Sequence, residues 1–575
     1  MIRAVRLELL CLLACLAAAC AGPSGRSTEQ AAQPAAGAPA QRASRTLVAI
    51  ARVEPASLTS KSLTQLGIAS ATTTRLFNAG LMLMDERDNV QPYLVERLPE
   101  VNTASWRILP DGTMETTYRL RPNLTWHDGH PLTAEDFVFA ARVYGNRELG
   151  VANTAPVNQF EQLLAPDART LVIRWLRTYP NAARMTAIEF QPLPAHLLDE
   201  PFRQLPAEAF LALPFWTTDY VSAGPYRVER WDGGSGIDLQ AFAGHALGQP
   251  KIDRMRIIFV PDPNTAVANL FSGAAHLTLD EGIRFQQGVV VRREWSARGA
   301  GSVLVMPGLW RFVQIQLHPE RVNPRALTDV RVRRALAYTL DRDGLNEAIF
   351  EGEAPPSYGI IPPNVDYYSE LERSVVKYPF DPRQSEQFMI EAGFVKGSDG
   401  TYARSPGGPL SMELRVSAGS QNEAESAIMA AAWRTNGFGI SEFAQSTALS
   451  QAPESRVQYP ALRGSNTTPG EEALAGLGTA GTPRPENRWF GTNRGAWSNP
   501  EFDRVLDQFH TTVDRPLRVQ HIIQMVRIMS EELPAIPINF TPYVIAFASS
   551  VQGPRAVGPE NQVTWNVHEW TMSGS

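Results

Sequence analysis

The sequence predicts an α/β fold that is divided into lobes. Short apolar segments typical of buried strands, such as Thr46–Ala51 and Met255–Val260, alternate with helical segments such as Pro263–Gly273. The chain has 575 residues, of which about 530 follow residue 45. Because a single hydrophobic core rarely serves more than about 250–300 residues, this part of the chain is expected to form two or three lobes.

The first 20 residues have the features of a secretory signal. Two arginines precede a mainly apolar run from Leu7 to Ala19, which is shorter than the about 20 residues that span a bilayer. Residues Ala17–Cys20 resemble the lipobox of bacterial lipoproteins, which implies lipid attachment at Cys20. The alternative is cleavage by the ordinary signal peptidase, with Cys20 as part of the apolar segment. We therefore expect residues 1–20 to be a lipoprotein signal peptide.

All three cysteines, Cys11, Cys15 and Cys20, lie in this signal. The mature chain would keep one thiol and could form no intramolecular disulfide. Residues 21–45 are rich in Ala, Pro, Gly, Ser and Gln and contain no large apolar side chain. Such a segment cannot bury enough surface to offset its conformational entropy, so we expect a disordered tether.

The composition excludes several classes of function. With a net charge of −6, 43% hydrophobic and 19% charged residues, the chain is typical of soluble proteins, and no basic cluster indicates nucleic-acid binding. It contains no nucleophile elbow, HExxH helix or phosphate-binding glycine loop. His127, Asp128 and His130 surround one turn without a fourth ligand, which favours a polar turn over a zinc site. We expect no enzymatic activity, no metal and no cofactor.

The segment Thr116–Tyr144 contains the clearest local pattern. Apolar and polar residues alternate from Thr116 to Arg121, which predicts a strand with one wet face. Asp128-Gly129 and Pro131 predict a tight turn. Thr133 can cap a following helix, and the next two acidic residues place negative charge in its first turn.

Several motifs in this order resemble one family. LRPNLTWHDGHPLTAEDFVFAARV is similar to the signature segment of the family 5 extracellular solute-binding proteins, the oligopeptide, dipeptide and nickel-type receptors of ABC importers. DVRVRRALAYTLDRDGL, YPFDP followed by EAGF, and NPEFD resemble further segments of the same family. The resemblance implies an α/β periplasmic-binding-protein-like two-lobed fold (type II, cluster C) with an extra inserted domain.

The resemblance also implies a domain division. Domain I would combine residues 46–80, 215–305 and 540–575, domain II would be the inserted residues 81–214, and domain III would be residues 306–539. Ligand would bind between domains I and III. A mostly parallel main sheet and a monomeric protein are expected.

A cleft that closes on a small molecule needs aromatic faces and a few oriented polar groups. Ten residues are candidates for this role on their chemical type, and the alternative for them is packing in the core or on the surface. These candidates are Asn78, Trp216, Tyr220, Trp310, Arg463, Ser465, Asn466, Trp489, Asn493 and Arg494.

The segment Tyr459–Thr468 is the most informative about the ligand. It occupies the place where peptide-binding members of the family carry a Trp and an Asp that meets the ligand ammonium. This chain has Arg463, Ser465 and Asn466 there. The nearest acids, Glu471 and Glu472, would point in different directions. We therefore expect a ligand with a carboxylate, phosphate or hydroxyl group, and weak binding of free-amine peptides.

Two functions are compatible with this sequence. The first is a receptor, lipid-anchored in an extracytoplasmic or periplasmic location, that delivers a small polar solute or peptide to an ABC permease and its ATPase. The second is a lipid-anchored sensor that signals to a membrane partner without transport. A neighbouring permease operon would favour the first function, and a neighbouring sensor kinase would favour the second.

Overall fold

The computed structural model describes residues 46–63, 71–149, 154–354, 356–487, 489 and 491–573. The signal peptide expected over residues 1–20, with its Cys20, and the tether expected over residues 21–45 lie outside the described residues. The strand predicted at Thr46–Ala51 forms at those residues.

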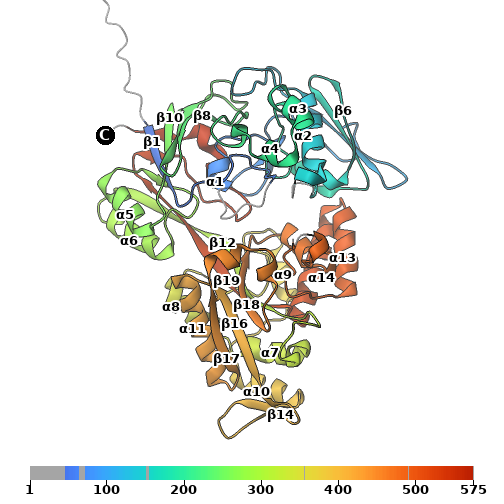
Figure 1. Cartoon of the computed structure of the whole chain (residues 1–575), viewed down its shortest axis with the longest axis vertical. Coiled ribbons are helices and arrows are strands. Elements are labelled where there is room, and N and C mark those ends of the chain that lie inside the picture. The colour runs from blue at the N-terminus through green and yellow to red at the C-terminus, as the bar shows by residue number, and fades with distance from the viewer. Residues whose placement is uncertain are drawn as a thin grey trace, which may run out of the picture. The chain divides into compact units, whose positions relative to one another are not determined.

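A ten-stranded mixed sheet runs through the molecule (Figure 1). Its strands, in order across the sheet, are β17 (Gly439–Gln445), β16 (Ser411–Ser417), β18 (Leu462–Thr467), β12 (Gly301–Ile315), β19 (Ala535–Ala548), β11 (Leu277–Thr278), β1 (Thr46–Ala51), β10 (Arg254–Phe259), β9 (Gly236–Ala241) and β8 (Tyr226–Asp232). Strand β1 is parallel to β10 and β11, and β16 is parallel to β17 and β18. The other pairings are antiparallel. The prediction of a mostly parallel sheet is therefore wrong, because the β8–β9 hairpin and the β12–β19 pair add antiparallel neighbours.

Strands β12 and β19 connect the two lobes (Figure 1). They pair antiparallel from Gly301 opposite Ala548 to Gln314 opposite Ala535, with a register shift between Pro307 and Trp310. Gly308 lies inside this shift, and a Cβ atom there would come within 2.7 Å of the Thr541 carbonyl oxygen. We call residues 46–307 and 542–573 the first lobe, and residues 308–541 the second lobe.

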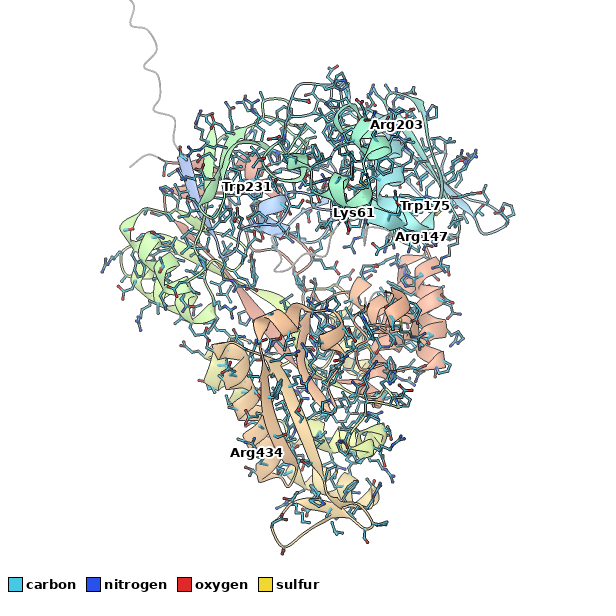
Figure 2. All side chains as sticks on the ribbon, in the orientation of Figure 1. Lys61, Arg147, Trp175, Arg203, Trp231 and Arg434 are labelled. Atoms are coloured by element: carbon cyan, nitrogen blue, oxygen red, sulfur yellow. The ribbon has the colours of Figure 1, made fainter. Side chains whose placement is uncertain are left out.

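The first lobe contains a second sheet, which the expected insertion supplies. Its strand order is β4 (Trp106–Ile108), β5 (Met114–Arg119), β7 (Thr170–Trp175) and β6 (Phe160–Asp167). The predicted strand, turn and helix of residues 116–144 are confirmed as β5 and α2 (Ala134–Gly145), and the Thr133 amide donates to Asp136 Oδ2 at 2.8 Å. Trp175, marked in Figure 2, is fully buried in this lobe. Further first-lobe elements include α1 (Ala71–Thr74), β2 (Met82–Met84), β3 (Val90–Pro92), η3 (Pro180–Arg184), α3 (Ala195–Gln204), α4 (Ala207–Leu211), α5 (Pro263–Ser272), α6 (Phe285–Ser296), β20 (Val551–Gln552), η10 (Val563–Glu569) and β21 (Thr571–Met572).

The second lobe packs helices on both faces of its part of the main sheet. Val313 and Leu462 lie in a core that includes Trp433 of α11, and Trp310 and Phe312 lie in a core on the other side with α13 and α14. Its helices are α7 (Val330–Tyr338), α8 (Arg342–Phe350), α9 (Tyr368–Ser374), α10 (Pro382–Glu391), α11 (Ser420–Thr435), α12 (Thr447–Gln451), η7 (Glu472–Leu477), α13 (Pro500–Thr511) and α14 (Arg515–Glu532), and its small sheet consists of β13 (Val395–Lys396), β14 (Tyr402–Arg404) and β15 (Gly408–Pro409).

The hydrophobic clusters show how the expected domains are built. One cluster joins residues of the inserted segment, such as Phe137 and Trp175, with Leu47 and Ile257 of the main sheet. The segment 81–214 therefore shares a core with the rest of the first lobe. The boundaries given for domains I, II and III stay a prediction.

Candidate functional site

The candidate site begins on strand β18. Arg463 and Ser465 project from the same face, because strand side chains alternate, and Arg463 lies opposite Gln314 of β12. Leu462 and Asn466 point to the other face, where Leu462 joins the core beneath α7 and α11. Asn466 is exposed there. The structure therefore brings two of the three residues that distinguish this segment to one face and places Asn466 away from them.

Arg463 is a deeply buried cation with few partners. Its side chain is 3% exposed, and its Nη1 donates to Gln445 Oε1 at 2.9 Å. Burial lowers the pKa of Arg463 to about 10, and the charges of Arg415 and Arg456 act in the same direction. Within the described part of the chain, no carboxylate lies within ion-pair distance of Arg463.

Arg494 approaches the same face from a loop. Gln314 Nε2 donates to the Thr492 carbonyl at 2.9 Å, and the Leu317 amide donates to the Gly495 carbonyl at 2.8 Å, so both ends of this loop are tied to β12 or its continuation. Burial, followed by the charges of Arg456 and Arg463, lowers the pKa of Arg494 to about 10. The Arg494 side chain has no hydrogen bond or ion pair to any residue that the structure describes.

Four buried polar atoms on the segments that carry or adjoin the two arginines have no partner among the described residues. They are Gln314 Oε1, Tyr459 Oη, Ser465 Oγ and Thr492 Oγ1. A buried polar atom without a hydrogen bond costs about 1–3 kcal/mol. We call Gln314, Tyr459, Arg463, Ser465, Thr492 and Arg494 the polar cluster. Its unmet donors and acceptors suit a polar molecule from outside the chain.

Three candidates from the sequence lie in the interior of the first lobe. Asn78 is fully buried, and its amide nitrogen donates to Leu58 O, Ser60 Oγ and Thr74 O. Its Oδ1 accepts from Tyr220 Oη at 2.5 Å and from Ser222 Oγ at 3.0 Å. Asn78 and Tyr220 thus hold loops of the first lobe together. Trp216 is 5% exposed and donates to the Phe210 carbonyl at 2.7 Å.

The other candidates in the second lobe have different surroundings. Trp310 is fully buried, stacks on Phe312 and donates to Ser357 Oγ at 3.1 Å. Asn493 is buried and exchanges hydrogen bonds with the Trp497 backbone, which shapes the loop that carries Arg494. Trp489 lines a separate pocket of about 410 Å³ whose walls include Arg321. None of these three belongs to the polar cluster.

Sequence reasoning missed Gln314, Gln445 and Thr492. Gln314 could have been found, because it is a polar residue on the same strand face as the apolar Phe312. The contributions of Gln445 and Thr492 depend on contacts between segments far apart in the chain. No local pattern marks them.

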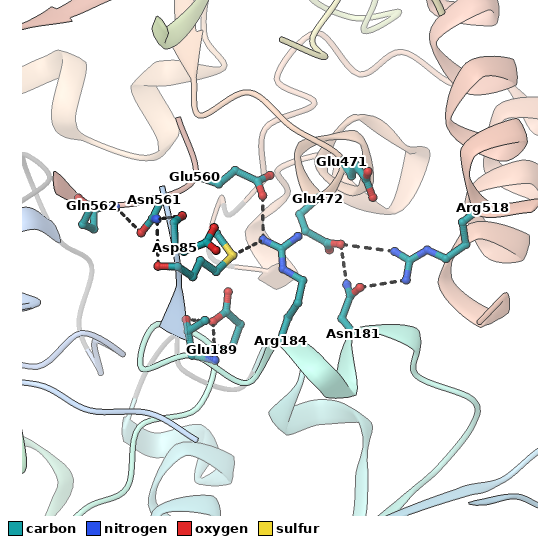
Figure 3. Close-up of polar contacts among 12 residues, drawn as sticks. Asp85, Asn181, Arg184, Glu189, Glu471, Glu472, Arg518, Glu560, Asn561 and Gln562 are labelled. Atoms are coloured by element: carbon teal, nitrogen blue, oxygen red, sulfur yellow. Dashed lines mark hydrogen bonds and ion pairs between the residues drawn. The ribbon is translucent and has the colours of Figure 1, made fainter. Parts of the chain in front are cut away.

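Polar contacts join the two lobes near the end of β18 (Figure 3). Asn181 of η3 donates to Glu472 Oε1 at 2.6 Å and accepts from Arg518 Nη1 at 3.0 Å. Arg184, from the same turn, donates to Glu560 Oε2 at 2.8 Å within the first lobe. Strand β18 ends at Thr467 and Glu472 follows five residues later, so one segment carries Arg463, Ser465 and Glu472.

The two acids nearest to the polar cluster in sequence have other partners. Glu471 accepts from Arg515 at 2.9 Å and from Tyr367 at 3.0 Å. Burial acts to raise the pKa of Glu471, but hydrogen bonds and charge from Arg515 hold it below the ordinary value. Glu472 is directed to Asn181 and Arg518. The prediction that these acids point in different directions is confirmed.

The described residues contain no group of three or more His, Cys, Asp or Glu side chains suited to a metal ion. Of the residues weighed as ligands, His127 contacts the Gly224 carbonyl at 3.1 Å, Asp128 contacts His196 at 2.8 Å, and His130 stacks on His196. Within the same residues, no helix combines the length and apolar character needed to cross a membrane.

Comparison with known families matches residues 98–468 to the bacterial extracellular solute-binding proteins, family 5. This match covers well over half of the chain. The chain belongs to this family. A protein of Brucella ovis named as an ABC transporter peptide-binding protein is 24% identical to this family 5 chain over 294 residues. That alignment covers 51% of each protein, so the chain spans about half the length of this relative.

Solved structures of similar fold support the two-lobed architecture. NikZ from Campylobacter jejuni, in complex with Ni(L-His), has a TM-score of 0.73 and 19% identity, and the match covers 92% of this chain and 99% of NikZ. The oligopeptide-binding protein of Thermus thermophilus, in complex with a pentapeptide, has a TM-score of 0.73, 22% identity and coverage of 92% and 96%. The α/β two-lobed binding-protein fold expected from the sequence is confirmed.

Proposed function

We propose that this protein is the substrate-binding lipoprotein of an ABC importer. It captures a small solute, a peptide-like or other polar molecule, between its lobes and delivers it to a membrane permease that is driven by an ATPase. The observation that carries this proposal is the polar cluster of a family 5 chain, with the buried Arg463, the half-buried Arg494 and four buried polar atoms that lack partners among the described residues. Such a cluster is costly in a purely structural role.

One set of contacts between the lobes suits a reversible closing motion. It consists of the hydrogen bonds of Asn181 to Glu472 and Arg518, which water can replace on opening. The lobes also meet where Phe285 packs against Phe350 and Arg292 pairs with Glu353. The two lobes are joined by a pair of strands with an irregular register at Gly308. Binding proteins that close around a ligand use a few such residues as a hinge.

The proposal includes export and anchoring. The mature protein is held at the membrane, on its periplasmic or extracytoplasmic side, by a lipid on Cys20, and residues 21–45 serve as the tether. Mass spectrometry of the native N-terminus tests this anchoring. A diacylated or triacylated Cys20 is expected, and an unmodified N-terminus after Cys20 would overturn it.

Two experiments test the transport role. First, untargeted mass spectrometry of small molecules released by denaturing freshly purified protein should identify a stoichiometric solute. Second, uptake of that solute by vesicles that contain the genetically neighbouring permease and ATPase should depend on this protein. Absence of any bound solute, together with unchanged uptake when the protein is omitted, would contradict the proposal. Binding without uptake would favour the sensor role.

A further inference from the structure

We infer that the polar cluster is a subsite for an oxyanion of the captured solute, a carboxylate or a phosphate, held between Arg463 and Arg494. This inference rests on the proposed function and narrows its substrate class. Such a subsite would bind the negatively charged group of a solute, whereas the peptide-binding mode considered above depends on the ammonium group of the peptide.

Other buried arginines of the second lobe show what a structural arginine looks like in this protein. Arg333 is 3% exposed and donates to the carbonyls of Leu327, Thr328 and Glu532. Arg342 is 5% exposed and donates to the carbonyls of Pro537, Ala337 and Tyr378. Each therefore has most of its guanidinium donors satisfied by backbone oxygens, although burial lowers the pKa of both groups to about 10.

Arg463 and Arg494 lack such partners. The Arg463 side chain donates to Gln445, and the Arg494 side chain has no partner among the described residues. The two cations also lie close enough for the charge of Arg463 to act on Arg494. Arg463 is buried and Arg494 is half-buried. Two neighbouring cations that are withdrawn from water in this way without a carboxylate are unfavourable unless an anion joins them. Bidentate recognition of carboxylate or phosphate is the chemistry that guanidinium groups serve best.

The neutral members of the cluster fit the same ligand. Tyr459 Oη, Ser465 Oγ and Thr492 Oγ1 are hydroxyl oxygens that can donate to an anion, and all three lack partners among the described residues. Gln314 has its amide nitrogen engaged with Thr492 O, whereas its Oε1 is unpaired among those residues and can only accept. We therefore expect a hydroxyl or amide N–H next to the oxyanion of the ligand.

A ligand ammonium has no counter-charge in the polar cluster as the structure describes it. None of its six members is a carboxylate, and Glu471 and Glu472 are held by Arg515 and by Asn181 and Arg518. An ammonium group in the polar cluster would face two guanidinium groups. Electrostatics therefore favours an anion at this position.

The test compares probes that differ in one charge. Mature protein freed of co-purified solute is titrated by calorimetry with trialanine in four forms: unmodified, N-acetylated, C-amidated, and modified at both ends. Succinate and inorganic phosphate are the small carboxylate and phosphate probes. We expect N-acetylation to be tolerated, C-amidation to abolish binding, and succinate or phosphate to compete with the N-acetylated peptide. Tight binding of C-amidated, free-amine trialanine would overturn the inference, as would failure of every anionic probe to bind.

Substitutions test whether Arg463 and Arg494 bind the anionic probes. Arg463→Gln and Arg494→Gln should each weaken binding of the anionic probes about 30-fold or more, whereas Arg504→Gln, at an exposed position on α13, should leave binding unchanged. Because each variant removes a buried or half-buried charge that has no carboxylate partner among the described residues, the unliganded variants should have a thermal midpoint equal to or above that of the unchanged protein. Equal weakening by Arg504→Gln, or a lowered midpoint with unchanged binding, would mean that Arg463 and Arg494 are structural.

The experiments distinguish failure of the oxyanion subsite from failure of the proposed importer role. If uptake into permease vesicles depends on the protein but the Arg463→Gln and Arg494→Gln variants support it normally, the importer role stands and the oxyanion subsite is wrong. If the anionic probes bind as expected and no uptake occurs, the subsite stands and the importer role is wrong.

Discussion

At Asp88 the backbone takes a left-handed conformation with φ of 61°, and the carboxyl group lies among other acids of the first lobe. Burial, and then the negative charge of Glu560, raise the pKa of Asp88 to about 6. One of its carboxylate oxygens is buried without a partner among the described residues. The folded protein therefore favours the protonated, neutral form of the Asp88 carboxyl group over the ionised form.

The substitution Asp88→Asn should stabilise the protein at neutral pH. A carboxyl whose folded pKa is raised contributes stability below its unfolded value of 3.8, and this contribution is lost as the pH rises through about 6. Asparagine keeps the shape, tolerates positive φ and carries no charge. Urea unfolding should show a gain of about 1 kcal/mol at pH 7.5, reduced by solvent screening, and no gain near pH 4.

The exposed substitution Asp219→Asn serves as the control and should change the free energy of unfolding little at either pH. An equal gain for Asp88→Asn at pH 4 and pH 7.5 would show that conformation, and not ionisation, is responsible.

The candidate site could be predicted from single residues only in part. Arg463, Ser465 and Arg494 have the right chemical types, and the structure brings them to one polar cluster. The separation of Asn466 from its neighbours follows from strand alternation and was available in the sequence. The sequence does not show that four other candidates are buried, namely Asn78, Trp216, Tyr220 and Trp310. In sequence, an aromatic or amide side chain in the core looks the same as one that contacts a ligand.

At the scale of elements, the register shift between β12 and β19 depends on Gly308. A Cβ atom at this position would meet the Thr541 carbonyl oxygen at 2.7 Å and the Tyr543 side chain at 3.1 Å. Backbone oxygen cannot move aside without disturbing the pairing on both sides of the shift. A side chain at residue 308 would therefore strain the connection between the lobes.

We expect Gly308→Ala to lower the free energy of unfolding by about 1–3 kcal/mol through overpacking. Chemical denaturation measures this change. The matched control is Gly145→Ala, at the end of α2, where an added Cβ meets nothing within 4 Å. That substitution should be neutral or slightly stabilising. Equal effects of the two substitutions would contradict a special role for the register shift.

Elements with strong local patterns were predictable, and elements made by tertiary pairing were not. The alternation at residues 116–120 and the cap at Thr133 correspond to β5 and α2. In contrast, β12 extends from Gly301 to Ile315 and includes Pro307. Proline is rare inside a strand, so only the pairing with β19 and its register shift make this length possible.

For the whole molecule, Asn181 is one of the residues that link the lobes, since its amide contacts both Glu472 and Arg518. Asn181→Ala removes two hydrogen bonds to charged groups and leaves Glu472 and Arg518 4.0 Å apart. We expect the closed arrangement to lose about 1–3 kcal/mol relative to an open one. Small-angle scattering of the unliganded protein should show a larger radius of gyration.

The control for this prediction is Asn158→Ala, at an exposed position of the first lobe that contacts Gln159. It should leave the scattering profile unchanged. If Asn181→Ala also leaves the profile unchanged, the contacts between the lobes do not determine closure.

The two-lobed α/β fold was predictable from the chain length, the alternation of strands and helices, and the family resemblance. That the inserted segment shares a hydrophobic core with the main sheet was not predictable. Trp175 and Phe137 of the inserted segment lie in one hydrophobic cluster with Leu47 of the main sheet. Whether two segments have separate cores depends on contacts between distant residues, which hydrophobic periodicity does not report.

The pairing of β12 with β19 places the entry and the exit of the second lobe next to each other, with Trp310 opposite Phe540. Two large hydrophobic clusters consist entirely of residues of this lobe, and all six members of the polar cluster lie within residues 308–541. A fragment of these residues, with neighbouring ends, has what an autonomous folding unit needs. Titration of the fragment with phosphate would measure the affinity of the polar cluster alone. The difference between the binding free energies of the fragment and of the intact protein would give the contribution of the first lobe.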